Sequence, residues 1–147
     1  MSVTIRSLLV VLLMSLSGMV PAQAQTAAPD TAFDGAAFAD VIEGQIAAFS
    51  RDDGAAAFAL ASPDIRRRLV TAERFMAMVR ARFQPVYRPR SYSFGAPALV
   101  DGIPVQPLRV IGPDGRGMVA LYRMERQTDG SWRIAGVTLH PTGERGI

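Results

Sequence analysis

Asp52 and Asp53 are adjacent carboxylates, the pair in this sequence that most resembles an acid–base dyad. Such a dyad works when its two groups face each other or flank a substrate. Here the pair lies in "SRDDG", directly after an apolar helical stripe ends at Phe49. Aspartate in that place caps a following helix, in this case "GAAAFALA", so we expect Asp53, or Asp52, to be the cap. The pattern predicts a helix corner rather than a catalytic pair.

Arginine is the second group of residues with chemical potential. All 16 basic residues are arginine, and eight of them lie between residues 66 and 90 against one acid, Glu73. Residues 30–64 show the reverse, with seven acids against Arg51. The basic segment could gather an anion, an acidic partner or a membrane surface, or it could be a solvated face that the acids partly neutralise. The candidate ligand-binding residues are Arg66, Arg80, Arg82, Tyr87 and Arg88.

Several familiar chemistries lack their residues. With no cysteine, the chain has no disulfide, thiolate metal site or cysteine nucleophile. The single histidine, His140, has no visible partners for a metal or a base role, so we interpret it as a structural or surface residue. "GPDGRG" is typical of a hairpin turn, not of a phosphate loop. We therefore assign no catalytic residue and expect neither metal nor cofactor.

Residues 1–24 have the pattern of a signal peptide. Arg6 precedes an apolar run, Ser7–Val20, and the small residues Ala22 and Ala24 precede an expected cleavage before Gln25. An uncleaved anchor is the alternative, but the run is shorter than the ~20 residues of a spanning helix. We expect a periplasmic or secreted protein with no stable membrane anchor after cleavage.

The remaining 123 residues fit one domain. We expect a disordered leader over 25–33, a single α+β domain over 34–141 and a flexible tail over 142–147. After cleavage the charge is 15 arginines minus 13 acids, or +2. Export and this low charge argue against nucleic acid as a partner.

The first half of the domain has the periodicity of helices. One apolar stripe predicts a helix over 35–50, made of Phe38, Val41, Ile42, Ile46 and Phe49. Ser62 and Thr71 are expected to cap two further helices, the first with Pro63 at its first position. Pro85 should end the last of them.

The second half changes to the period of strands. Four are expected, over 86–94, 104–112, 117–127 and 131–140, with Asp-Gly pairs in the turns between them. Arg88 and Arg90 would then share one face of the first strand, with Tyr87 on the other. Pro107 predicts an edge or a bulge in the second strand, and apolar residues on both faces predict a central third strand covered on both sides. Helices followed by an antiparallel meander predict an α+β fold.

Three segments carry a resemblance to a known family, "VIEGQIAAFSRDDGAAAFALASPDIR", "FMAMVRARFQPVYRPRS" and "ALYRMERQTDGSWRIAGVTL". Over about residues 38–140 the chain resembles an exported bacterial family known as domain of unknown function 4864. Its helix–corner–helix opening and "DGSWRIAGV" strand are also similar to the cone fold of nuclear transport factor two. That similarity implies a curved antiparallel sheet of about four strands around a helix, with a pocket at the open end.

The wider cone-fold superfamily includes isomerases, hydratases and non-catalytic binding domains. An isomerase-type site needs a carboxylate base and a tyrosine, and neither Asp101 nor Tyr87, Tyr92 or Tyr122 can be placed on that motif. We therefore expect a module that binds a small molecule, an anionic partner or a protein, without catalysis. The alternatives are an isomerase or hydratase that uses the pocket, and a structural homodimer formed through the sheet.

Overall fold

The structure is a computed structural model that describes residues 35–145. The expected signal peptide over 1–24 and leader over 25–33 lie outside the described residues, as do residues 146 and 147. No helix in the described range is long and apolar enough to cross a membrane.

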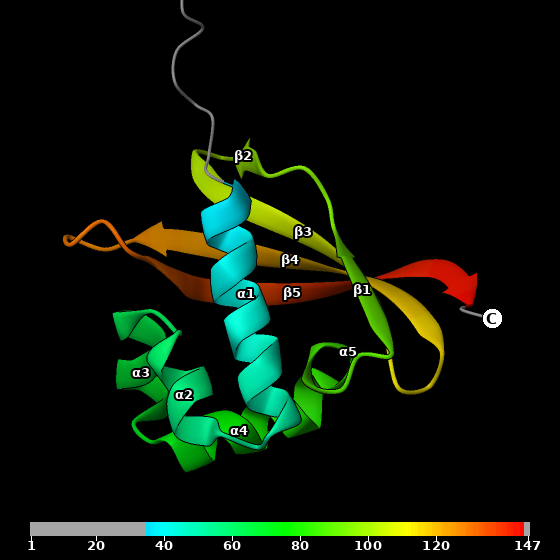
Figure 1. Cartoon of the computed structure of the whole chain (residues 1–147), viewed down its shortest axis with the longest axis horizontal. Helices are drawn as coiled ribbons and strands as arrows, with labels where there is room; N and C mark the ends of the chain where they lie inside the picture. Colours follow the sequence, from blue (N-terminus) through cyan, green and yellow to red (C-terminus); the bar gives the residue numbers. More distant parts are fainter. Residues whose placement is uncertain (1–34, 146–147) are drawn as a thin grey trace, which may run out of the picture.

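Within residues 35–145, five helices precede five strands, and Figure 1 shows how they are arranged. The helices are α1 (Gly35–Ser50), α2 (Gly54–Ala59), α3 (Pro63–Leu69), α4 (Ala72–Arg82) and α5 (Gln84–Tyr87). The strands are β1 (Ser91–Phe94), β2 (Ala98–Val100), β3 (Ile103–Ile111), β4 (Arg116–Arg126) and β5 (Trp132–Arg145). All strand pairings are antiparallel, so the predicted α+β class is confirmed.

The helix boundaries follow the expected caps. Asp53 accepts a hydrogen bond from the amide of Ala56 at 3.0 Å, so it is the cap of α2. Ser62 and Thr71 cap α3 and α4 in the same way. A capping side chain satisfies one of the amides that the first helical turn leaves free. The corner predicted at residues 52 and 53 is therefore confirmed.

The sheet has the order β1-β3-β4-β5, and the short strand β2 pairs with β3 beyond β1. The sequence predicted four strands and missed β2, which lies before a two-residue turn at Asp101 and Gly102. Both turn residues have positive φ, as a tight hairpin with the twist of a sheet requires. The central position of the third expected strand, β4, is confirmed. Its outward-facing Val119 and Leu121 are half-buried, while Ala120 and Tyr122 are buried on the helix side.

The prediction of one strand over 86–94 is wrong. Residues 84–87 form the helical turn α5, with Pro85 in its first positions, and the strand begins at Ser91. Val86 and Tyr87 are buried by packing against the core, which outweighs their preference for extended structure. Arg88 and Tyr87 therefore do not lie on opposite faces of a strand.

Pro107 lies in an interior strand, not at an edge or a bulge of its own. The Gly95 amide donates to the Pro107 carbonyl at 3.0 Å, but Pro107 has no amide hydrogen to donate in return. The buried side chain of Gln106 supplies that hydrogen bond, because its Nε2 donates to the Gly95 carbonyl at 2.7 Å. The ladder between β1 and β3 ends here, at the position where the proline interrupts it.

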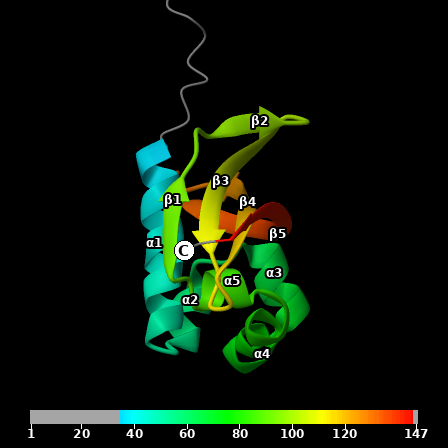
Figure 2. The same cartoon turned by 90° about the vertical axis from the view of Figure 1, so that its right-hand side faces the viewer.

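Helix α1 runs from the sheet to the other helices (Figures 1 and 2), and its residues join two apolar cores. Its first part packs on the sheet, where Phe38 and Ile42 join Leu108, Ala120 and other inward-facing strand residues; we call this cluster the sheet core. Its last part packs among the other helices in a second cluster, the helix core. The helix core contains Ala48, Phe49, Ala57, Ala61, Phe75, Met76, Val79 and Tyr87. The partly buried Phe83 contacts both cores.

The junction between α2 and α3 attaches to β5, the strand at one edge of the sheet. The Ser62 amide donates to the Ile134 carbonyl at 2.8 Å, and the Ile134 amide donates to the Leu60 carbonyl at 2.9 Å. Beyond this bridge, β5 shifts register against β4 between Arg123 and Met124. The strand continues to Arg145, so the flexible tail predicted from residue 142 begins too early.

Candidate functional site

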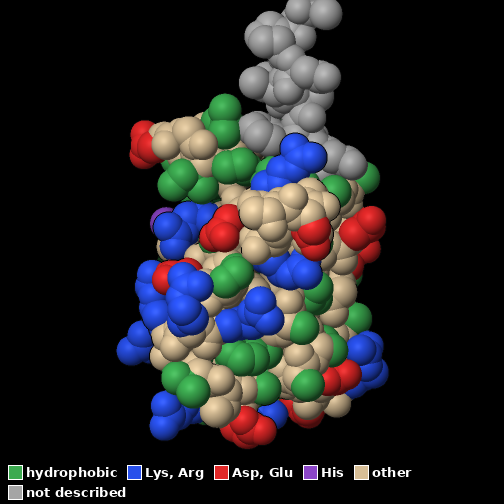
Figure 3. All heavy atoms as spheres, turned by 90° about the vertical axis from the view of Figure 1, so that its left-hand side faces the viewer, with side chains coloured by type: hydrophobic (Ala, Val, Ile, Leu, Met, Phe, Trp, Pro, Cys, Tyr) green, Lys and Arg blue, Asp and Glu red, His purple; other side chains and the backbone are tan. Residues whose placement is uncertain are grey.

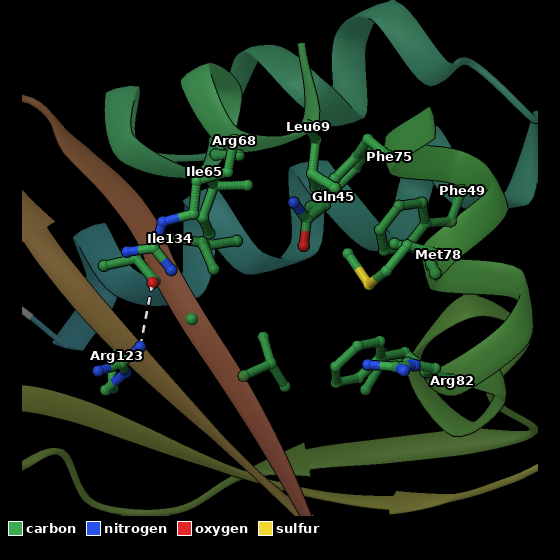
Figure 4. Close-up of a pocket in the computed structure, with 17 residues that line it drawn as sticks. Gln45, Phe49, Ile65, Arg68, Leu69, Phe75, Met78, Arg82, Arg123 and Ile134 are labelled. Atoms are coloured by element: carbon green, nitrogen blue, oxygen red, sulfur yellow. Dashed lines mark hydrogen bonds between the residues drawn. The ribbon is translucent and has the colours of Figure 1, made fainter. Parts of the chain in front are cut away.

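A cavity of about 320 Å³ lies where the sheet core and the helix core meet (Figure 4). Most of its wall is apolar, formed by side chains that include Phe49, Ile65, Phe75, Met78, Val86 and Ile134. They come from α1, α3, α4, α5 and β5. Its volume is at the lower end of the roughly 300–1,000 Å³ that is usual for small-molecule sites. The geometry suits a small ligand with a large apolar surface.

Gln45 places one polar group in this apolar wall. The side chain is only 4% exposed, and its Nε2 donates to the Ala57 carbonyl at 3.2 Å. Its Oε1 points into the cavity (Figure 4) and accepts no hydrogen bond from any residue in the described part of the chain. An acceptor that no protein donor reaches is free to bond to a donor on a cavity occupant.

Three arginines also line the cavity, Arg68 from α3, Arg82 from α4 and Arg123 from β4. Figure 4 shows Arg68 and Arg123 on one side of the cavity and Arg82 on the other. Arginine side chains also gather on the face of the molecule that carries α3 and the turn between β4 and β5 (Figure 3). Within residues 35–145 the cavity wall includes no aspartate or glutamate, so its charged side chains are all positive.

The three arginines differ in their partners. Arg68 forms an ion pair with Asp64, one helical turn before it. Arg82 and Arg123 pair with no acid in the described part of the chain. Arg123 is the only one of these two with a hydrogen bond, from its Nη2 to the Ala135 carbonyl at 3.3 Å. Arg123 is thus an exposed cation with one hydrogen bond to the backbone and no ion pair among the described residues.

The side chain of Arg123 crosses β5 at Gly136, where there is no Cβ atom. A Cβ atom at residue 136 would lie 2.8 Å from Nε of Arg123, closer than real Cβ contacts allow, so the guanidinium would have to shift. The φ of Gly136 is not positive, so backbone conformation does not require a glycine here. The guanidinium therefore lies over the Gly136 backbone at the edge strand and reaches the cavity from the outer face of the sheet.

A strained turn lies beside the cavity, between α3 and α4. The Thr71 amide donates to the Leu69 carbonyl at 2.8 Å, across Val70 with φ 68° and ψ −46°. This is a γ-turn with a positive central φ, which is rare for a β-branched residue. Val70 is 63% exposed, so side-chain burial does not repay the strain. Strained backbone tends to occur near functional sites.

The predicted ligand-binding residues fall in three places. Arg82 lines the cavity. Arg80, Tyr87 and Arg88 lie together elsewhere, around Asp52, and line no part of the cavity. Arg66 is exposed on α3 and is also outside the cavity wall.

Asp52 is the centre of a polar cluster that joins distant segments. Its carboxylate accepts hydrogen bonds from the Tyr87 hydroxyl and, at 3.2 Å, from Arg80, and it pairs with Arg88 at 3.0 Å. Arg88 also stacks on the Tyr87 ring, 4.0 Å from its centroid, and donates to the Phe49 carbonyl. The Tyr87 hydrogen bond, and after it that of Arg80, lowers the pKa of Asp52. Through these contacts Asp52 joins the corner between α1 and α2 to α4 and α5.

The sequence missed three residues of this site, Gln45, Arg68 and Arg123. Gln45 had a readable signal, because it lies three residues after Ile42 and four before Phe49, on the apolar stripe of α1. Arg123 had none, since its path depends on the register shift that places Gly136 opposite it.

Groups suited to acid–base or metal chemistry lie outside the cavity. The described residues that line it include no histidine, tyrosine, aspartate or glutamate. Tyr122 is fully buried in the sheet core, and its hydroxyl has no hydrogen-bond partner. His140 is exposed on β5 beside Thr138. No group of residues suited to a metal ion occurs within the range that the structure describes.

Comparison with known proteins gives one match. A family model described as "Domain of unknown function (DUF4864)" matches residues 31–147. No curated protein and no solved structure matches the chain.

Proposed function

The chain belongs to the DUF4864 family, and we propose that it is a binding module that holds a small, mainly apolar ligand without catalysis. The ligand site is the cavity between the two cores. Export completes the proposal: residues 1–24 direct the chain out of the cytoplasm, and cleavage after Ala24 releases it into the periplasm or the medium.

The observation that carries the proposal is an apolar cavity into which Gln45 turns a side-chain oxygen that accepts no hydrogen bond from the described residues. Apolar walls with a few placed polar groups are the usual composition of small-molecule sites. A ligand that carries a donor can bond to this oxygen in place of water.

The absence of acid–base groups from the described cavity wall supports binding over catalysis. An isomerase or hydratase would place a carboxylate or histidine within hydrogen-bond reach of its substrate. The residues that could donate here are arginines, which stay protonated and serve to hold charge.

Dye binding to a cavity-filled variant tests the proposal. A neutral, environment-sensitive dye such as N-phenyl-1-naphthylamine should bind the purified full chain with a rise in emission. Met78→Trp should abolish that rise, because Met78 is half-buried and points into the cavity (Figure 4). Ala77→Trp is the matched control, since Ala77 is the exposed neighbour on the same helix. Equal dye binding by the wild type and Met78→Trp would place the dye elsewhere and contradict the proposal.

Mass spectrometry of protein isolated without refolding tests export and occupancy together. A chain that begins at Gln25 and carries a bound small molecule supports both parts of the proposal. A chain that retains residues 1–24 in a membrane fraction contradicts the export proposal.

Homodimerisation is a second candidate function, favoured by an apolar tip on the β2–β3 hairpin. Leu99, Val100 and Ile103 are 47%, 51% and 41% exposed there. Mass spectrometry under native conditions tests whether the chain is a dimer. If the wild type is a dimer and Val100→Glu is a monomer, the hairpin tip forms the interface.

A further inference from the structure

We propose that the ligand of the cavity is an amphipathic carboxylate, with its apolar body between the two cores and its carboxylate paired with Arg123. This inference rests on the proposed function and adds the chemical class of the ligand. Three features of the described residues support it: the charge of the cavity wall, the placement of Arg123 and the state of the other two arginines.

The cavity wall combines an apolar interior with positive charge and no compensating acid among the described residues. A neutral apolar ligand would gain nothing from the three guanidinium groups. An anion without an apolar body would leave the interior unused. An amphipathic anion satisfies both parts of the wall, since burial of its apolar body and pairing of its charge are separate favourable terms.

Arg123 is the cation best prepared for that pairing. Its hydrogen bond to the Ala135 carbonyl and its position over Gly136 orient the guanidinium toward the cavity before any ligand binds. An arginine presents five donors in a planar fork, so one bond to a carbonyl leaves an edge that can take both oxygens of a carboxylate. Preorganisation of this kind lowers the entropy lost on binding.

The other two arginines are less suited to hold the carboxylate. Arg68 is already paired with Asp64 on the surface of α3. Arg82 is in the last turn of α4, where a cation interacts with the carbonyl end of the helix. Both add positive charge to the wall, but neither has both a free charge and a backbone hydrogen bond as Arg123 has.

Three ligands of equal chain length separate the charge from the apolar body, namely octanoate, octan-1-ol and octyl phosphate. Calorimetric titration of the full chain at pH 7.5 should show octanoate binding at least about tenfold tighter than octan-1-ol, the effect of one charge-assisted pair. Octyl phosphate tests the choice of headgroup, because a guanidinium edge can pair with a phosphate as well as with a carboxylate. A phosphate that binds more tightly than octanoate would overturn the assignment to carboxylates.

Substitutions in the chain test which arginine pairs with the carboxylate of octanoate. Arg123→Gln should remove the preference for octanoate over octan-1-ol and leave binding of the alcohol unchanged. Gly136→Ala should do the same without a change of charge, because its Cβ displaces the guanidinium. Arg66→Gln, outside the cavity wall, is the matched control and should keep the preference, while Arg82→Gln, inside the wall, should reduce it less than Arg123→Gln does.

The outcomes distinguish this inference from the proposed function. If octan-1-ol binds as tightly as octanoate and Met78→Trp abolishes both, the cavity binds ligands but the carboxylate assignment fails. A preference that survives Arg123→Gln and disappears in Arg82→Gln also overturns it. If neither ligand binds, the proposed function fails, and the ligand class fails with it.

Discussion

The Tyr87 hydroxyl donates a hydrogen bond to Asp52, 35 residues before it in the sequence. This contact joins the α1–α2 corner to α5, and Arg80 and Arg88 complete it from two further positions on the chain. Asp52 itself has a φ of 53°, which aspartate tolerates better than most residues. The role of Asp52 is therefore to hold elements together, while Asp53 begins the next helix.

Asp52→Asn should lower the thermal stability of the protein at pH 7 but not in strong acid. The folded state lowers the pKa of Asp52, so its contribution is present above the unfolded value of about 3.9 and disappears as the pH falls through the lowered native pKa. Melting curves of both proteins between pH 7 and pH 2 should converge at the acid end. Asp53→Asn is the matched control and should melt close to the wild type, because asparagine caps helices about as well as aspartate. If the difference in melting temperature between Asp52→Asn and the wild type stays constant from pH 7 to pH 2, ionisation of Asp52 does not stabilise the fold.

Val70→Gly should stabilise the fold by about 1 kcal/mol, the order of the strain that a Cβ atom adds at positive φ. Urea unfolding measures the change. Val70→Ala keeps the Cβ and should recover little of it. Equal gains for alanine and glycine would assign the effect to loss of the exposed apolar side chain instead.

Tyr122→Phe should also stabilise the fold, by about 1 kcal/mol, because it removes a buried hydroxyl that has no hydrogen-bond partner. Burial raises the pKa of Tyr122, so the hydroxyl stays protonated in the folded state. Tyr92→Phe, at a tyrosine that is 38% exposed, should be close to neutral. A loss of stability in Tyr122→Phe, measured by urea unfolding, would show that a buried water satisfies the hydroxyl.

Gln106→Leu should destabilise the sheet by about 1–3 kcal/mol, the cost of leaving the Gly95 carbonyl without its donor. Adding Pro107→Val to this variant should restore part of the loss, because valine supplies the backbone amide that proline lacks. A double-mutant cycle from chemical unfolding measures the coupling. If the two substitutions change the free energy of unfolding additively, the backbone amide of residue 107 does not replace the side-chain donor of Gln106.

Elements with strong local signals could be predicted from the sequence. The stripe from Phe38 to Phe49 and the caps Ser62 and Thr71 gave α1, α3 and α4, since spacing and capping act over a few residues. The segment 86–94 could not be assigned correctly, because burial of Val86 and Tyr87 in the two cores decides whether they form a helical turn or a strand.

The candidate site was less predictable than the fold. Arg82 was chosen for its local concentration of charge, and it does line the cavity. The contact between Arg123 and Gly136 arises from strand register, and the partnership of Asp52 with Tyr87 arises from packing of α5. Both depend on pairings between distant segments, on which the composition of either segment carries no information.

The bridge between Ala61 and Ile134 limits how this protein can assemble. An edge strand with free amides and carbonyls invites another strand to extend the sheet, in a partner or in an aggregate. At Ile134 those groups are already bonded to Leu60 and Ser62, and at the next two residues the Arg123 side chain lies across the backbone. A strand that approached this part of β5 would have to displace both, so the segment that frames the cavity also protects the sheet from uncontrolled extension.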